Sequence, residues 1–259
     1  MGQLFLPKYR KPVFLLCFLI GWCVLGCRES GVPQSSVPPT PLPTTVPTPD
    51  QDPGGFDEAA ETAVPAAELV EEITILYTND EHGWMVGQQV GAGAANLVGH
   101  WHTVAGFDTE SGILLLSGGD MWTGPAISTW FQGQSMAEVM NAMGYDAAAV
   151  GNHEFDFGLD VLQMRAAESE FPFLSANIRY KSDGTTPEDL GIRPYTIVTV
   201  NNVQIGIIGL TTTHTPTTTN PVNVAQFDFI DYETALREVV PHVKAAGAEM
   251  VVVPGHICR

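Results

Sequence analysis

The chain has 259 residues and a formal net charge of −18 at pH 7, which argues against binding to nucleic acid or to an anionic membrane through a basic surface. Its apolar fraction of 44% is ordinary for a globular protein, and its length allows one large domain or two small ones. Only Cys258 lies outside the first 27 residues, so the body of the chain offers no intramolecular disulfide framework.

Residues 1–27 are predicted to be a signal peptide. A basic start precedes the apolar stretch PVFLLCFLIGWCVLG, which is shorter than the ~20 residues that a membrane-spanning helix needs. The segment ends in VLGC, which resembles the bacterial lipobox, in which the cysteine is acylated and becomes the first mature residue. We therefore expect a lipoprotein held at Cys27 on the extracytoplasmic side of a bacterial membrane. The alternative is a plain secretory signal.

Residues 28–71 are predicted to be a disordered linker. The stretch VPPTPLPTTVPTPD is rich in Pro and Thr and has no apolar period, which favours extended conformations. The acidic stretch that follows has too few large apolar side chains to form a core. The expected role is a spacer between the anchor and a folded domain at 72–259.

Strand and helix patterns alternate in residues 72–259, which predicts an α/β fold. Strands are expected at 73–78, 112–119, 146–150, 171–177 and 248–256, with a hairpin over 195–210 that turns at Asn201-Asn202. Helices are expected at 134–144, with Gly144 as C-cap, at 159–170, and at 231–247, with Asp231 as N-cap. We expect Trp122 and Trp130 to pack in a core.

Four of these strands end on residue types that bind metal ions well. They are Asp80 with His82, Asp120, Asn152 with His153, and His256. In α/β sheets ligands bind beyond the carboxyl ends of the strands, so these residues are expected to converge. Each signal alone is weak, because turns also use such residues. Together they predict one polar site.

The segments TNDEHGW, LLSGGDMWTGP, VGNHEFDFG and EMVVVPGH resemble the first four sequence blocks of the calcineurin-like metallophosphoesterases. The similarity is greatest to the extracytoplasmic 5'-nucleotidase branch, which also contains UDP-sugar hydrolases and 2',3'-cyclic nucleotide phosphodiesterases. It covers roughly residues 72–256. The resemblance implies a four-layer αββα sandwich with two divalent metal ions at one sheet edge.

The resemblance also assigns roles to residues of this chain. Asp80 and His82 would bind the first metal, Asp120 would bridge both, Asn152 and His256 would bind the second, and His153, oriented by Asp156, would contact the phosphoryl group. Imidazole, carboxylate and amide ligands suit Mn, Zn, Fe or Co. Two such ions supply the charge stabilisation that phosphoester hydrolysis requires. Glu154 is expected to support the site or the fold.

The expected function is a metal-dependent phosphoric-ester hydrolase that releases phosphate from nucleotides outside the cytoplasm. The alternative is a non-catalytic lipoprotein remnant that at most binds metal or phosphate. The thiosulfohydrolase branch of the superfamily departs at the Asn-His pair, so Asn152 and His153 argue against it. No nucleic-acid partner is expected.

The family pattern contains a fifth block, which supplies one further ligand to each metal, and this chain ends before it. We therefore expect a sandwich that is incomplete at the C-terminus, with an exposed edge on its last strand. For residues 28–259 alone, we expect weak metal binding and little or no nucleotidase activity.

Overall fold

The computed structural model describes residues 4–5, 15–20, 72–109 and 111–257. All of these described residues belong to one compact unit. The predicted linker at 28–71 and the predicted lipidation site Cys27 lie outside the described residues. None of the described helices is long and apolar enough to cross a membrane.

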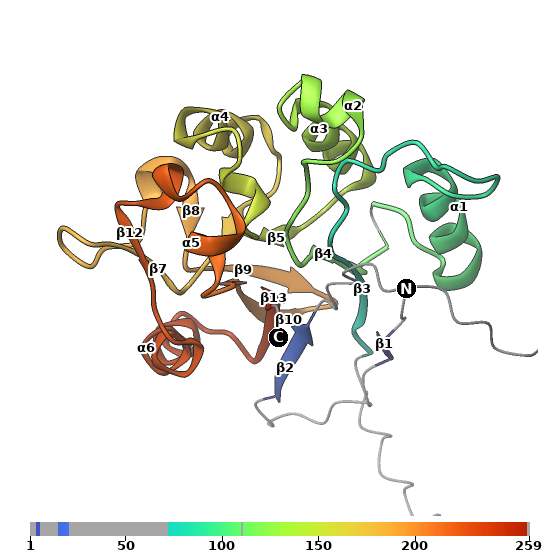
Figure 1. The fold of residues 1–259 in the computed structure, drawn as a ribbon. Helices are drawn as coiled ribbons and strands as arrows, with labels where there is room; N and C mark the ends of the chain where they lie inside the picture. The colour runs from blue at the N-terminus through green and yellow to red at the C-terminus, as the bar shows by residue number, and fades with distance from the viewer. Residues whose placement is uncertain (1–3, 6–14, 21–71, 110, 258–259) are drawn as a thin grey trace, which may run out of the picture. The chain divides into compact units, whose positions relative to one another are not determined.

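The first sheet carries most of the predicted site residues at its strand ends. Its order is β1-β3-β4-β5-β6-β8, and all neighbours are parallel except the antiparallel pair β1 and β3. The strands are β1 (Leu4–Phe5), β3 (Thr74–Thr78), β4 (Leu114–Ser117), β5 (Ala147–Ala149), β6 (Phe173–Leu174) and β8 (Ile192–Arg193). Because β3, β4 and β5 are parallel, the loops that follow them leave from the same edge (Figure 1).

The second sheet is built on the predicted hairpin. β9 (Tyr195–Val200) pairs with β10 (Val203–Ile208), and the turn residues Asn201 and Asn202 have φ values of 49° and 63°, as a type I′ turn requires. β10 is parallel to β13 (Met250–His256). β11 (Leu210–Thr211) pairs with the end of β13, so that Thr211 lies opposite His256.

The other side of β13 is paired with β2 (Leu15–Ile20), in parallel, from Leu15 opposite Met250 to Ile20 opposite Gly255. In the unprocessed chain the expectation of an exposed edge on the last strand is therefore wrong for the described residues, whereas removal of residues 1–26 as a signal peptide would take β2 away and expose that edge. An unpaired edge presents a row of N–H and C=O groups, and the backbone of β2 pairs with them. The assignment of residues 1–27 as a signal peptide stays a prediction.

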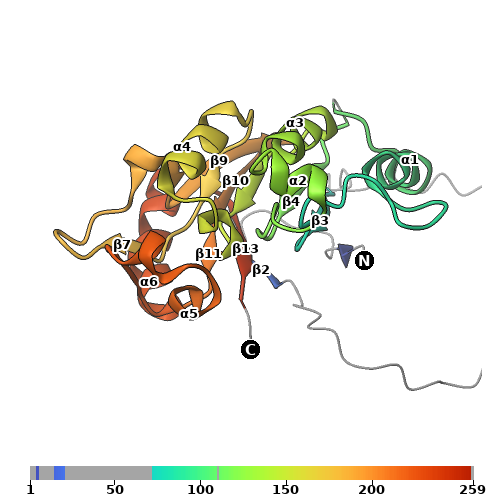
Figure 2. The same cartoon turned by 45° about the horizontal axis from the view of Figure 1, so that its top comes forward.

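Helices cover the outer faces of both sheets (Figures 1 and 2). α1 (Ala94–Ala105), α3 (Gln134–Met143) and α4 (Leu159–Glu168) contribute to a core on the first sheet, and α6 (Tyr232–Ala245) packs on the second. Between the sheets lies an aliphatic core that includes Ile75, Leu116, Ile205 and Val252. The predicted αββα layering is confirmed.

Shorter elements complete the described fold. α2 (Ala126–Trp130) and α5 (Thr215–Thr218) are single short helices, β7 (Ile178–Tyr180) pairs with β12 (Phe227–Phe229), and the 3-10 helices are η1 (His153–Phe155), η2 (Glu188–Leu190) and η3 (Pro221–Val224).

Two predicted helix caps are confirmed, and one packing prediction is wrong. Gly144 ends α3 with φ 78°, and the Asp231 side chain accepts a hydrogen bond from Thr234 N at the start of α6. Trp122 is buried and packs against Phe173, as expected. Trp130, by contrast, is 83% exposed, because α2 is too short to bury more than Ser128.

Candidate metal centre

The predicted ligands meet at the carboxyl ends of β3, β4, β5 and β13. Asp120 is buried at the centre of the group, which we call the Asp120 cluster: Asp80, His82, Asp120, Asn152, His153 and His256. The Oδ2 atom of Asp120 lies 3.0 Å from Nε2 of His256 and 3.9 Å from Nε2 of His153. Nε2 of His82 lies 3.6 Å from Oδ1 of Asp80. Residues from four separate strand ends thus lie close enough together to bind shared metal ions.

The backbone of the cluster is held in an uncommon conformation. Asp80, His82 and Asp120 have φ values of 54°, 45° and 57°, in the left-handed region that non-glycine residues seldom adopt. The two loops are joined by bonds from Asp80 N to Gly119 O (3.0 Å) and from His82 N to Asp120 O (2.9 Å). A Cβ on Gly151 would clash with Oδ1 of Asp120. Only glycine therefore allows the loop after β5 to approach Asp120.

Two of the imidazoles are fixed by their Nδ1 atoms. His82 Nδ1 donates to the carbonyl oxygen of Thr123 at 2.9 Å, and His153 Nδ1 donates to Oδ2 of Asp156 at 2.6 Å. Asp156 is held in turn by the Thr219 hydroxyl, which donates to Oδ1 at 2.7 Å. Histidines that bind metals or act on substrates are oriented in this way, with Nε2 left for the ligand.

The hydrogen bonds also set the charge state of this pair. The bond to Asp156 raises the pKa of His153, against the effect of burial. Burial acts to raise the pKa of Asp156, but the hydrogen bonds from His153 and Thr219 outweigh it and lower that pKa. The pair therefore favours an imidazolium beside a carboxylate.

Glu154 connects the loops that carry the cluster. Its carboxylate is 1% exposed and accepts backbone N–H bonds from Asp120 (2.9 Å), Met121 (2.8 Å) and Gly151 (2.5 Å). Burial and the nearby charge of Asp120 raise the pKa of Glu154 to about 7, although the three N–H bonds favour the ionised form. Glu154 thus supports the site through specific contacts, because its hydrogen bonds fix the loop after β4 to the loop after β5.

The Thr-rich loop after β11 supports the site although the sequence suggested no role for it. The carbonyl oxygen of Thr218 accepts a bond from Nδ2 of Asn152 at 3.2 Å, and the adjacent Thr219 holds Asp156. With Nδ2 engaged, the amide oxygen of the buried Asn152 is the atom suited to bind a hard cation. Repeated threonines after a short strand are too common a pattern to predict these contacts.

The residues of the cluster fit a divalent metal ion. Two groups, Asp80-Asp120-His256 and His82-Asp120-His153, each offer one ligand atom per residue within 4.8 Å of one another. The donors are carboxylate oxygens and imidazole nitrogens without thiolate, which suits Mn, Zn, Fe or Co. Two carboxylates close together repel each other unless a cation is shared, so a metal would also relieve the charge at Asp80 and Asp120.

We expect the thermal stability of the metal-free protein to fall as the pH rises from about 5 to about 9. Burial raises the pKa of Glu81 and of Glu154 from 4.5 to about 7, so the folded state binds more protons than the unfolded state in that interval. The hydrogen bond to Asp80 raises the pKa of His82 from 6.5 to about 9, which extends the same effect to higher pH. The free energy of unfolding therefore falls between about pH 4.5 and 7 through the two glutamates and between about pH 6.5 and 9 through His82.

The measurement is the melting temperature in EDTA at pH 5, 7 and 9, repeated with Mn²⁺. Added metal should weaken or reverse the trend, because metal binding requires deprotonated ligands. A melting temperature that rises steadily with pH in EDTA would contradict the expected sign.

An αββα sandwich with carboxylate and imidazole side chains gathered at the strand ends defines the metallophosphoesterase class. The chain is 35% identical over 196 residues to a snake venom 5'-nucleotidase of Gloydius brevicauda, an overlap of 71% of this chain and 33% of the relative. The solved 5'-nucleotidase precursor of Thermus thermophilus is similar with a TM-score of 0.63 and 28% identity, over 71% of this chain and 37% of that one. The solved calcineurin-like phosphoesterase YfkN of Bacillus subtilis is similar with a TM-score of 0.59 and 26% identity, over 71% of this chain and 61% of that one.

Over this span the chain belongs to the calcineurin-like metallophosphoesterases, in the branch of the 5'-nucleotidases. No protein-family model matches it. The chain spans about a third of the length of the curated relatives that it matches.

Proposed function

We propose that this protein is a metal-dependent phosphoric-ester hydrolase of the 5'-nucleotidase type, which releases phosphate from nucleotides outside the cytoplasm. The observation that carries the proposal is the convergence of the Asp120 cluster, with the His153–Asp156 pair beside it. The relatives that are named 5'-nucleotidase support a nucleotide as the substrate class. A remnant without activity would have no need of the second set of contacts, through Glu154 and Thr219, that fixes the cluster.

Two divalent metal ions, Mn, Zn, Fe or Co, are the proposed cofactors. The first would be held by Asp80, His82 and Asp120, and the second by Asp120, Asn152 and His256. Bound cations of this kind stabilise the charge of the phosphoryl group and lower the pKa of a bound water. The anchored Nδ1 atom of His82 supports its role, because Nε2, which faces Asp80 at 3.6 Å, is then the nitrogen that a metal could bind.

His153 is proposed to contact the phosphoryl group, and Asp156 to orient it. With Nδ1–H committed to Asp156, the protonated Nε2 can donate to a phosphoryl or leaving-group oxygen. The hydrogen bond to Asp156 raises the pKa of His153, which favours the protonated imidazole that this role needs. The distance of 3.9 Å between Nε2 of His153 and Oδ2 of Asp120 supports a donor that lies beside the metal ligands.

The test is phosphate release from AMP and from p-nitrophenyl phosphate by the complete product of the gene, with Mn²⁺. We expect release that depends on Mn²⁺, that is abolished by EDTA, and that is lost in Asp120→Asn. A protein that binds Mn²⁺ in calorimetry but releases no phosphate from either compound would support the non-catalytic alternative instead.

We propose that the protein is an extracytoplasmic lipoprotein, anchored at Cys27 by acyl chains, with residues 28–71 as the tether. The apolar segment that ends in VLGC supports the anchor. The similarity to a protein named snake venom 5'-nucleotidase supports a location outside the cytoplasm. Each buried methylene of an acyl chain contributes ~0.8 kcal/mol to membrane binding, so two or more chains suffice for stable anchoring.

Replacing Cys27 by alanine should move the protein from the membrane fraction to the soluble fraction, or leave it unprocessed. The measurement is fractionation of cells that express the wild type or Cys27→Ala, followed by mass spectrometry of the mature N-terminus. Cys23→Ala is the matched control and should stay with the membrane. Equal membrane association of both forms, with the signal cleaved, would contradict the anchor.

A further inference from the structure

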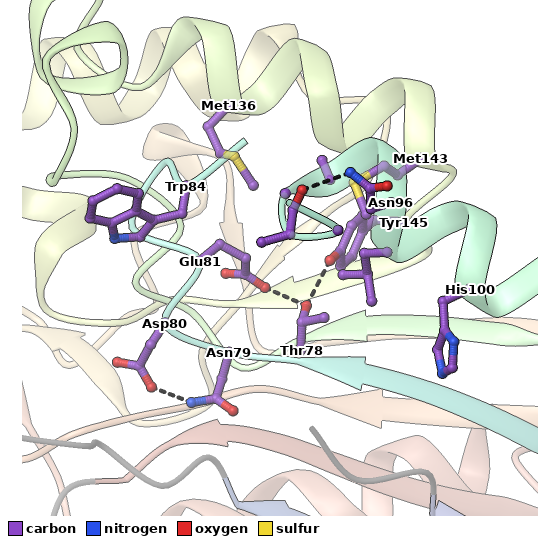
Figure 3. A pocket seen from close by; sticks show the side chains of 15 residues that line it. Thr78, Asn79, Asp80, Glu81, Trp84, Asn96, His100, Met136, Met143 and Tyr145 are labelled. Carbon is purple, nitrogen blue, oxygen red and sulfur yellow. Dashed lines mark hydrogen bonds between the residues drawn. The ribbon is translucent and has the colours of Figure 1, made fainter. Parts of the chain in front are cut away.

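A pocket of about 520 Å³ lies beside the Asp120 cluster, between α1 and α3 and above the end of β3 (Figure 3). This volume is in the range of small-molecule sites. Of the cluster residues only Asp80 also lines the pocket. Figure 3 shows the side chain of Glu81 turned toward Thr78 and Tyr145, whereas that of Asp80 is turned away from them. The pocket is therefore a neighbour of the candidate metal centre and not a part of it.

The floor of the pocket is a chain of hydrogen bonds that ends on the carboxylate of Glu81. The Thr78 hydroxyl donates a hydrogen bond to Oε1 of Glu81. The Tyr145 hydroxyl, 2.6 Å from Thr78 Oγ1, must therefore donate a hydrogen bond to Thr78. From the other side Ser117 donates to Oε2 at 3.0 Å and itself accepts from Gly119 N at 3.1 Å. All of these donors point toward Glu81, which is the arrangement that holds a negative charge.

That charge has no cationic partner within the described part of the chain, where the ion pairs of lysine, arginine and histidine go to other carboxylates. The residues that line the pocket include two acids, Asp80 and Glu81, and neither lysine nor arginine. A half-buried carboxylate in such a place is costly, and it favours the protonated form unless a cation compensates the charge.

The walls are suited to the body of an organic cation. Met136, Met143 and Tyr145 are buried in the core and face the pocket, and Trp84 borders it with 44% of its surface exposed. Aromatic faces attract ammonium groups, and thioethers adapt to varied apolar shapes. An anionic ligand such as a phosphate would meet two carboxylates here and gain little from these walls.

We propose that this pocket is a second binding site, which takes a small organic cation: an ammonium group on an aromatic or aliphatic body. The ammonium group would lie at Glu81, and the body would pack between Trp84, Met136 and Met143. The site is independent of the hydrolase activity proposed above, since its contacts use none of the residues assigned to the phosphoryl group.

The test is calorimetric titration of the Mn²⁺-saturated complete gene product with phenethylammonium, with phenethyl alcohol and 3-phenylpropionate as neutral and anionic analogues. We expect the cation to bind with a dissociation constant near ~1 mM, and each analogue to bind at least ~10-fold more weakly. Saturating Mn²⁺ keeps the ammonium from competing for the metal centre. Equal binding of the alcohol, no binding of the cation at ~10 mM, or binding seen only in EDTA would overturn the proposal.

Two variants locate the site. Glu81→Gln keeps the size of the side chain and removes its charge, and should weaken binding of the cation by at least ~10-fold, whereas Glu138→Gln on the exposed face of α3 should leave it unchanged. Trp84→Ala changes a partly exposed side chain and should weaken binding severalfold. If Glu81→Gln does not fold, Trp84→Ala decides. Wild-type affinity in either folded pocket variant would overturn the assignment.

Discussion

Replacing His153 by asparagine should lower turnover of AMP by about 10²–10⁴-fold while the bound metal changes little. The imidazole is held by Asp156 through Nδ1 at 2.6 Å, so its Nε2 is the only ring nitrogen left to act on a phosphoryl oxygen. Asparagine is too short to offer a donor at the same place, and it cannot carry the positive charge that Asp156 favours in His153. Asp156→Asn should cost less, because it disturbs the orientation of the ring and leaves the ring in place.

The measurement is kcat for AMP together with the metal content of each purified variant, in the Mn²⁺-loaded complete gene product. His242→Asn, on the exposed side of α6, is the matched control and should match the wild type. The metal content is decisive because His82, Asp120 and His153 also form a group that can hold an ion. If His153→Asn halves the metal stoichiometry, His153 is a ligand and the role proposed here is wrong.

Glu154→Gln should lower metal affinity by about 10–100-fold and destabilise the fold, although Glu154 is not proposed to touch the metal. The carboxylate accepts N–H bonds from Asp120, Met121 and Gly151, and both of its oxygens are used. An amide turns one oxygen into an NH₂ group, which faces a backbone N–H and leaves it unpaired in the interior. Each buried group left unpaired in this way costs ~1–3 kcal/mol.

The measurements are Mn²⁺ titration by calorimetry and chemical unfolding of the metal-free protein, compared with wild type and with Glu138→Gln. Glu138 lies on the exposed side of α3, so its variant reports the effect of removing a carboxylate without these bonds. Loss of stability in Glu154→Gln with unchanged metal affinity would mean that Glu154 serves the fold alone. Unchanged values of both would contradict the contact that joins the two loops.

The sequence alone determined the fold class and the place of the candidate metal centre. The short β-branched and aliphatic runs 73–78 and 112–119 contain the strands β3 and β4, and the strongest strand and turn signals, including Asn201-Asn202, are local. Because parallel strands present their carboxyl ends at one edge, polar residues that follow such runs must converge, whatever lies between them. Asp80, Asp120 and His256 could therefore be grouped from the sequence, and the structure brings them together.

Only the tertiary structure decided which side chains support the cluster. Glu81 and Glu154 both follow a buried strand in the sequence, yet Glu154 binds three backbone N–H groups of two loops, and Glu81 closes a chain of hydroxyls at the base of a pocket. The tertiary structure likewise exposes Trp130 and pairs β2 with β13. These outcomes depend on distances between loops far apart in the chain and on which edge or surface remains uncovered after packing. Local propensity and spacing carry no information about either.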